Sequence, residues 1–137
     1  MSDRIFCRIM AKQIPATVVH EDEHTLAFMD IGQVNPGHVL VAAKVHADNI
    51  YALDDVQAAA LFRSAARVAR AIRSAFSPEG LSLYQANGAA AGQTVFHFHM
   101  HLVPRYADDG MSLTWPVKNP PREKLEENAA KIREQLA

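Results

Sequence analysis

Residues 92–104 read GQTVFHFHMHLVP, a run with a histidine at every second position from 97 to 101. Strict alternation of polar and apolar side chains is typical of a half-buried β-strand, whose successive side chains point to opposite faces. Neighbours on one face lie roughly 7 Å apart, because a strand rises about 3.3 Å per residue. Pro104 is expected to end the strand, since it has no N–H to donate to a continuing ladder. The pattern predicts a core set, Phe98, Met100 and Leu102, and a histidine set on the opposite face, His97, His99 and His101.

The rest of the chain alternates between strand-like and helix-like patterns. Residues 54–76 carry apolar side chains at helical spacing, and Asp54 or Asp55 is a suitable N-cap. The sequence SPEG at 77–80 is expected to stop this helix. Shorter β-prone runs, bounded by polar residues or by Pro and Gly, predict strands. We expect helices at 3–11, 54–76 and 121–136, and strands at 17–20, 24–30, 38–43, 81–86 and in the histidine run.

This order of elements predicts an α+β fold. We expect a five-stranded, mainly antiparallel sheet with one long central helix and a C-terminal helix, while the pattern leaves the strand order open. A chain of 137 residues fits one domain, 1–137, that buries a core without disulfides.

Composition and charge give only general expectations about partners and location. A net charge of −1 gives no electrostatic reason to expect nucleic acid or a membrane as a partner. The single cysteine, Cys7, cannot form an internal disulfide and fits a reducing compartment. The N-terminal segment has charges and no long apolar run, so we expect a cytoplasmic protein without a signal peptide. An arginine stripe on the 54–76 helix fits a solvated surface, or a face for an anion or partner: Arg63, Arg67 and Arg70.

The three histidines have three interpretations. They could be an ordinary polar surface, although imidazole has no special advantage there. They could bind a transition metal, but no carboxylate or cysteine stands beside them in the run to complete a ligand set. They could be reactive, because neutral imidazole is a competent nucleophile near neutral pH and its neighbours can hold phosphoryl oxygens.

The loop that precedes the histidines supports the reactive interpretation. Its sequence, NGAAAGQT at 87–94, contains two glycines that permit close approach of a ligand to the backbone. Asn87, Gln93 and Thr94 add side chains that can hydrogen-bond a phosphate. Such a loop alone is a weak signal, but next to the histidine run it predicts a phosphate site.

The sequence resembles the histidine triad superfamily, whose signature is His-φ-His-φ-His-φ-φ, where φ is an apolar residue. HFHMHLV at 97–103 matches every position, and similar blocks occur at 28–31 (FMDI) and 35–41 (NPGHVLV). The resemblance extends from about residue 4 to residue 106. The expected helix at 121–136 then belongs to a C-terminal extension. It implies a similar α+β fold and a homodimer with one continuous sheet.

The resemblance also implies a chemistry: hydrolysis or transfer of a nucleoside monophosphate, here most simply of an adenosine conjugate such as a phosphoramidate or dinucleoside polyphosphate. The middle histidine, His99, would attack phosphorus to give a nucleotidyl-histidine intermediate, without a required cofactor. His101 would bond the phosphate and His97 would fix the histidine network. Asp30 would accept hydrogen bonds from the ribose, and Ile31 would lie at the nucleoside. The phosphate and leaving group would meet the loop residues Asn87, Gln93 and Thr94.

Two further points follow from the resemblance. His38 is expected to be a structural histidine, with a place near the site as the alternative. Some bacterial relatives hold zinc with a Cys-x-x-Cys pair and two histidines; here Met10 replaces the second cysteine. We therefore expect no bound metal, with Cys7, His46 and His97 as the residues of a weakened site. A rival to the enzyme is a nucleotide-binding sensor or adaptor with the same residues and no turnover.

Overall fold

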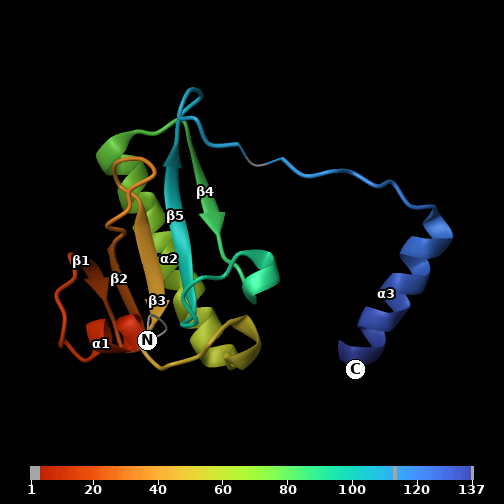
Figure 1. The fold of residues 1–137 in the computed structure, drawn as a ribbon, viewed down its shortest axis with the longest axis horizontal. Helices are drawn as coiled ribbons and strands as arrows, with labels where there is room; N and C mark the ends of the chain where they lie inside the picture. Colours follow the sequence, from red (N-terminus) through yellow and green to blue (C-terminus); the bar gives the residue numbers. More distant parts are fainter. Residues whose placement is uncertain (1–3, 113, 137) are drawn as a thin grey trace.

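The structure is a computed structural model that describes residues 4–112 and 114–136 (Figure 1). Its helices are α1 (Ile5–Met10), α2 (Asp55–Phe76) and α3 (Arg122–Leu136), with short 3-10 turns η2 (Ile50–Ala52) and η3 (Ala89–Ala91). Its strands are β1 (Val18–Glu21), β2 (Thr25–Met29), β3 (Val39–Ala43), β4 (Gly80–Tyr84) and β5 (His99–Arg105).

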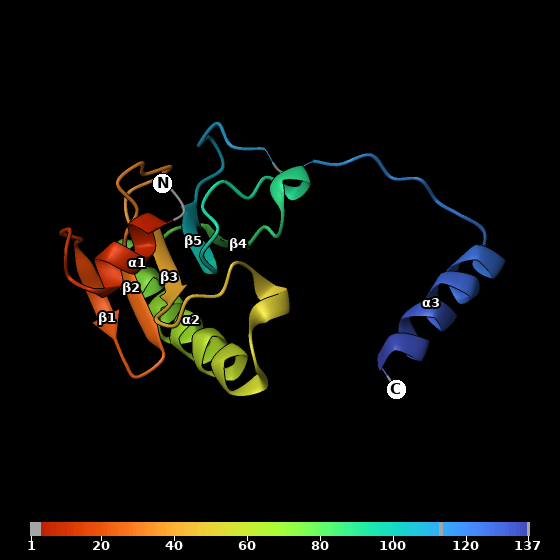
Figure 2. The same cartoon turned by 60° about the horizontal axis from the view of Figure 1, so that its bottom comes forward.

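All five strands form one antiparallel sheet in the order β1-β2-β3-β5-β4. The predicted α+β class is confirmed, and the strand order is the part that the sequence left open. Figure 2 shows α1 and α2 on opposite sides of the sheet. β4 is an outermost strand, so one of its edges has no neighbour in the described chain.

The long helix forms as its sequence predicts. Asp54 is the N-cap, and its carboxylate accepts from the Gln57 backbone while the Gln57 side chain accepts from the Asp54 backbone. Ser77 closes the helix in a left-handed conformation. The expected apolar face is buried at Leu61, Ala65, Val68 and Ile72, whereas Phe76 is 45% exposed and lies over Gly37.

The main core lies between α2 and the sheet. Phe98, Met100 and Leu102 enter it, as the alternation predicts, and meet α2 residues such as Leu61. Each fully buried large aliphatic side chain stabilises the fold by about 1.5–3 kcal/mol. A smaller apolar cluster, which includes Phe6 and Leu40, covers part of the opposite face. The histidine face of β5 is therefore partly enclosed rather than fully solvated.

Two expectations about the histidine strand are wrong. β5 begins at His99, so His97 precedes the strand. Pro104 does not end it, because β5 continues to Arg105. The reason is local: β3 pairs with β5 only as far as Leu102, and the Pro104 carbonyl points to that vacant side, where Asn35 donates to it at 2.7 Å. The nitrogen of the same residue faces that side too, so no ladder bond is lost.

A side chain in place of Gly37 would strain the backbone and crowd its neighbours. Its φ is +98°, and a Cβ there would lie 2.9 Å from the Phe76 ring and 3.2 Å from Pro104. Among the described helices, none is both long enough and apolar enough to cross a bilayer.

Candidate active site

The ring of His99 is fixed by its own chain. Nδ1 of His99 lies 2.7 Å from the carbonyl oxygen of His97, so the proton resides on Nδ1 and is donated to that carbonyl. The other nitrogen, Nε2, then carries the lone pair. Phe6 packs edge-on against the same ring at a centroid distance of 4.9 Å. The backbone and α1 thus present an imidazole whose Nε2 can act as a base or nucleophile.

His101 is fixed by His38, which the sequence interpretation treated as structural. The Val34 backbone N–H donates to Nδ1 of His38 at 3.2 Å, which leaves the ring proton on Nε2. That Nε2–H lies 2.9 Å from Nδ1 of His101 and donates to it. His101 therefore carries its own proton on Nε2, as a donor for an oxygen atom.

Asp30 belongs to the same group. Its Oδ2 lies 3.3 Å from Nε2 of His38 and 3.8 Å from Nδ1 of His101, and its Oδ1 accepts from the Gly32 backbone at 2.8 Å. Asp30 directly follows β2 and His38 directly precedes β3; because these strands pair, the two residues are neighbours, and the Asp30 backbone N–H donates to the His38 carbonyl. The carboxylate closes one end of the histidine row.

Burial keeps these imidazoles neutral. It lowers the pKa of His99, and it lowers the pKa of His101 to about 4, with the neighbouring His99 and His38 acting in the same direction. Burial also lowers the pKa of His38 and of the fully buried His97. A free imidazole has a pKa near 6.5, so at neutral pH all four rings are uncharged.

The same shifts make stability depend on pH. Below about pH 6.5 the unfolded chain binds protons that the folded chain excludes, so the free energy of unfolding falls as pH is lowered. For His101 alone, the loss between pH 7 and pH 4.5 should be about 2 kcal/mol. Urea unfolding at both pH values measures it, and the His101→Gln variant should show a smaller loss. An equal loss in that variant would show that His101 does not contribute.

Two hollows meet at the histidines. The larger, of about 340 Å³, has walls that are mainly apolar and includes Asp30 at its edge. The smaller, of about 30 Å³, lies against the 87–94 loop. Thr94, His99 and His101 line both hollows, so they stand where the two join. Ile31, which the resemblance placed at the nucleoside, lines the larger hollow together with other apolar residues: Ile5, Phe6, Ile9, Ile14, Phe28, Leu40 and Val95.

The loop residues differ in what their side chains contact. Gln93 is buried, and its amide bonds the backbone of Gly88 at 2.7 Å and of Asp48 at 2.6 Å, so it shapes the loop. Asn87 lines neither hollow; its amide pairs with that of Gln85 and accepts from the backbone of Ile50. The exposed Thr94 is the loop side chain best placed for a ligand.

A second group of donors lies behind His97. Cys7 Sγ is 3.2 Å from Nδ1 of His46 and 3.6 Å from Nδ1 of His97. The Nε2 atoms of the two rings are held by Asp48 at 2.7 Å and by the Ala43 carbonyl at 2.6 Å. Both Nδ1 atoms thus face the sulfur, and the three predicted residues of a weakened metal site do come together.

This donor set does not complete a structural zinc site. Such sites are four-coordinate and closed. Cys7, His46 and His97 supply three donors, and Met10, three residues after Cys7, packs against the smaller apolar cluster and offers only a thioether, which is a weak zinc ligand. The chemistry below therefore uses no metal.

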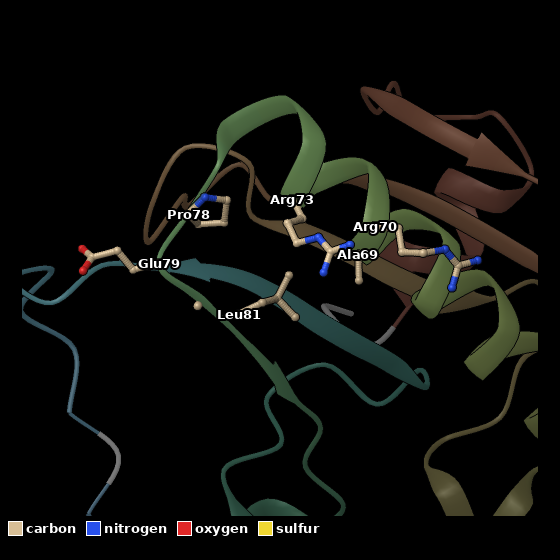
Figure 3. Close-up of a pocket in the computed structure, with 7 residues that line it drawn as sticks. Ala69, Arg70, Arg73, Pro78, Glu79 and Leu81 are labelled. Carbon is tan, nitrogen blue, oxygen red and sulfur yellow. The ribbon is translucent and has the colours of Figure 1, made fainter.

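Another hollow, of about 250 Å³, lies between α2 and β4 (Figure 3). Arg70 and Arg73 stand at its rim above Leu81. Leu81 is on the α2 side of the sheet, like Leu83, which pairs with the core residue Leu102. This hollow is thus on the opposite face from the imidazoles and contains none of them.

Sequence reasoning missed the contact of His38 with His101 and the place of Tyr84. The Tyr84 ring lies 5.8 Å from that of His101 and lines the smaller hollow. A signal existed for His38: it shares a face with Leu40, and Leu40 pairs with His101. Using it requires the register between two strands that are 60 residues apart, which the sequence pattern does not supply.

Comparison with known proteins gives the following similarities. Residues 11–108 match the model of the HIT domain family. Protein hit of Bacillus subtilis is 50% identical over 112 residues, 81% of this chain and 77% of that protein. Adenosine 5'-monophosphoramidase hnt1 of Schizosaccharomyces pombe is 35% identical over 82% of each chain. Adenylylsulfatase HINT3 of Arabidopsis thaliana is 32% identical over 79% of this chain and 55% of that protein.

Solved structures of HIT family proteins have the same fold. A crystal structure of a HIT family member from Bacillus subtilis superposes with a TM-score of 0.93 at 45% identity, covering 97% of this chain and 96% of that chain. A HIT family protein from Bacillus anthracis gives a TM-score of 0.92 at 44% identity, covering 96% and 95%.

Proposed function

This chain belongs to the HIT domain family, and from that premise we propose that it is a nucleotidyl hydrolase or transferase that acts on conjugates of a nucleoside 5'-monophosphate. The observation that carries the proposal is the 2.7 Å contact of His99 Nδ1 with the His97 carbonyl, which leaves Nε2 unprotonated at the junction of an apolar hollow and a smaller hollow beside the glycine loop. The names of the Schizosaccharomyces pombe and Arabidopsis thaliana relatives favour adenosine conjugates with an amine or sulfate leaving group.

The two hollows suit the two ends of such a substrate. The nucleobase would enter the larger hollow among its apolar walls, with the ribose toward Asp30, whose carboxylate can accept from two hydroxyls. The α-phosphate would lie at the junction, against Thr94 and the Nε2–H of His101. The leaving group would point toward the 87–94 loop.

The reaction would proceed in two displacements. Nε2 of His99 forms a bond to the α-phosphorus, the bond to the leaving group breaks, and the leaving group departs with that electron pair and takes up a proton. The Nδ1–H bond to the His97 carbonyl stabilises the positive charge that develops on the ring. Water then attacks phosphorus and releases a proton to solvent, and the electron pair of the phosphorus–nitrogen bond returns to Nε2 of His99.

We also propose that the protein is a homodimer joined at β4. Among the described residues, no strand pairs with the outer edge of β4, and an open edge is a template for pairing with another strand. Apolar side chains of β4 itself are exposed: Leu81, Leu83 and Tyr84.

Product analysis tests the enzymatic proposal. The protein, kept in a chelator, is given adenosine 5'-phosphoramidate, adenylyl sulfate and diadenosine polyphosphate in parallel, and AMP is measured by chromatography. We expect AMP from at least one of them, at rates that rank the leaving groups. Tight binding of AMP by calorimetry without product over hours would instead support the sensor. Turnover that stops in chelator and returns with zinc would contradict the metal-free chemistry.

A further inference from the structure

The C-terminal part of the chain stands away from the sheet. Residues 114–136, called the arm below, consist of an extended segment and α3, and both views show α3 separated from the body (Figures 1 and 2). No hydrogen bond or ion pair joins α3 to the body within the described residues, and no α3 side chain there is buried. The arm nevertheless carries large apolar side chains that are 53–80% exposed: Trp115, Val117, Leu125, Ile132 and Leu136.

The apolar residues of α3 form one stripe. Leu125, Ala129, Ile132 and Leu136 follow each other at intervals of four, three and four residues, which places them on a single face of the helix. A helix of 15 residues is marginal by itself in water, and its exposed ion pairs add little. The stripe therefore needs a surface to pack against.

The segment that precedes the arm is hydrogen-bonded to the body. The Arg105 guanidinium bonds Asp109 at 2.7 Å and the Met111 carbonyl at 2.7 Å, and Asn35 also donates to Asp109. These bonds tie the chain to the body up to Met111. Figures 1 and 2 both show that it leaves on the β4 side of the sheet and reaches beyond the open edge of that strand.

The arm also has the same place in other molecules. The superpositions on the two Bacillus structures cover 96–97% of this chain at TM-scores of 0.92–0.93, so they include α3. A helix that touches nothing would be free to point anywhere. Its agreement between related molecules indicates that a contact from outside the chain holds it.

We propose that the arm packs its apolar stripe on the body of a second copy of this chain, so that each copy clasps the other. A second sheet that joins at β4 would occupy the space between the body and α3, and two-fold symmetry would return the partner's arm in the same way. The inference rests on the dimer proposed above and goes beyond it, because pairing of β4 edges alone does not involve the arm.

A matched pair of full-length variants tests this. Ile132→Glu places a charge on the stripe, whereas Ala130→Glu places the same charge on nearly the opposite face of α3, at an exposed residue. We expect Ile132→Glu to raise the dimer dissociation constant about tenfold or more in analytical ultracentrifugation, and Ala130→Glu to change it less than twofold. Equal effects of the two variants, or a wild-type chain that is monomeric at tens of micromolar, would overturn the proposal.

Photo-crosslinking distinguishes an arm that packs on a second copy from an arm that folds back on its own body. Benzoylphenylalanine is placed at Ile132 or, as a control, at Glu127 on the opposite face, in a mixture of nitrogen-15-labelled and unlabelled chains. We expect mixed-isotope cross-linked peptides from position 132 and few from 127. Peptides of one isotope only would mean that the arm binds its own body and would refute the exchange. AMP release measured in the same samples reports on the enzymatic proposal separately, since neither position lines the histidine site.

Discussion

Alanine in place of His99 should lower turnover of the best substrate by about 10⁴-fold or more, because the variant has no lone pair to attack phosphorus. AMP should still bind within a few-fold of the wild-type affinity, because the apolar hollow and Asp30 remain. Single-turnover kinetics measure the first effect and calorimetry the second. His24→Ala, which removes an imidazole from the turn between β1 and β2, is the matched control and should retain full turnover.

The covalent step adds a chemical signature to this experiment. Rapid acid-free quenching of wild-type protein with a slow substrate should yield a nucleotidyl adduct on the peptide that contains residue 99, stable to base and lost in acid. Turnover within tenfold of wild type in His99→Ala, or an adduct on another residue, would remove His99 from the role of nucleophile.

Phenylalanine in place of His38 should lower turnover by about 10²-fold, since it retains a ring but removes the Nε2–H that directs the proton of His101. Without that direction, His101 no longer holds its Nε2–H toward the phosphate, and the loss of one hydrogen-bond donor to the developing charge lowers turnover by about this factor. In His38→Phe, Nδ1 of His101 has no donor, so the ring is free to carry its proton on either nitrogen.

Nitrogen-15 NMR of labelled histidine measures that tautomer directly. We expect His101 to be protonated on Nε2 in the wild type and mixed in His38→Phe. His38→Gln, whose amide can donate to His101, should recover part of the turnover. If the tautomer of His101 stays unchanged while turnover falls, His38 acts through packing, and a lowered midpoint of thermal unfolding would accompany the loss.

The sequence was sufficient for those parts of the structure that depend on local periodicity. Alternation placed Phe98 and Met100 in the core and the imidazoles opposite, and the helical spacing and Asp54 cap located α2. It misjudged Pro104, because tolerance of proline in β5 depends on where its neighbour β3 stops.

Other parts of the site depend on contacts that no local pattern encodes. The bond between His38 and His101 is set by strand register, and the engagement of Gln93 with the Asp48 backbone is set by loop packing. The assignment of Gln93 to the phosphate therefore stays a prediction, and Asn87, satisfied by Gln85 and Ile50, is the least favoured of the loop residues for it.

The alternation along β5 has a practical consequence for any assay. Core and reactive side chains share one strand, and sliding it by a single residue would exchange the two faces, so that imidazoles would be forced into the apolar interior. A misaligned β5 would therefore prevent correct folding and would also remove the imidazoles from the site. Preparations that differ in specific activity should differ in the fraction of correctly folded molecules, and an active-site titration can serve as a count of them.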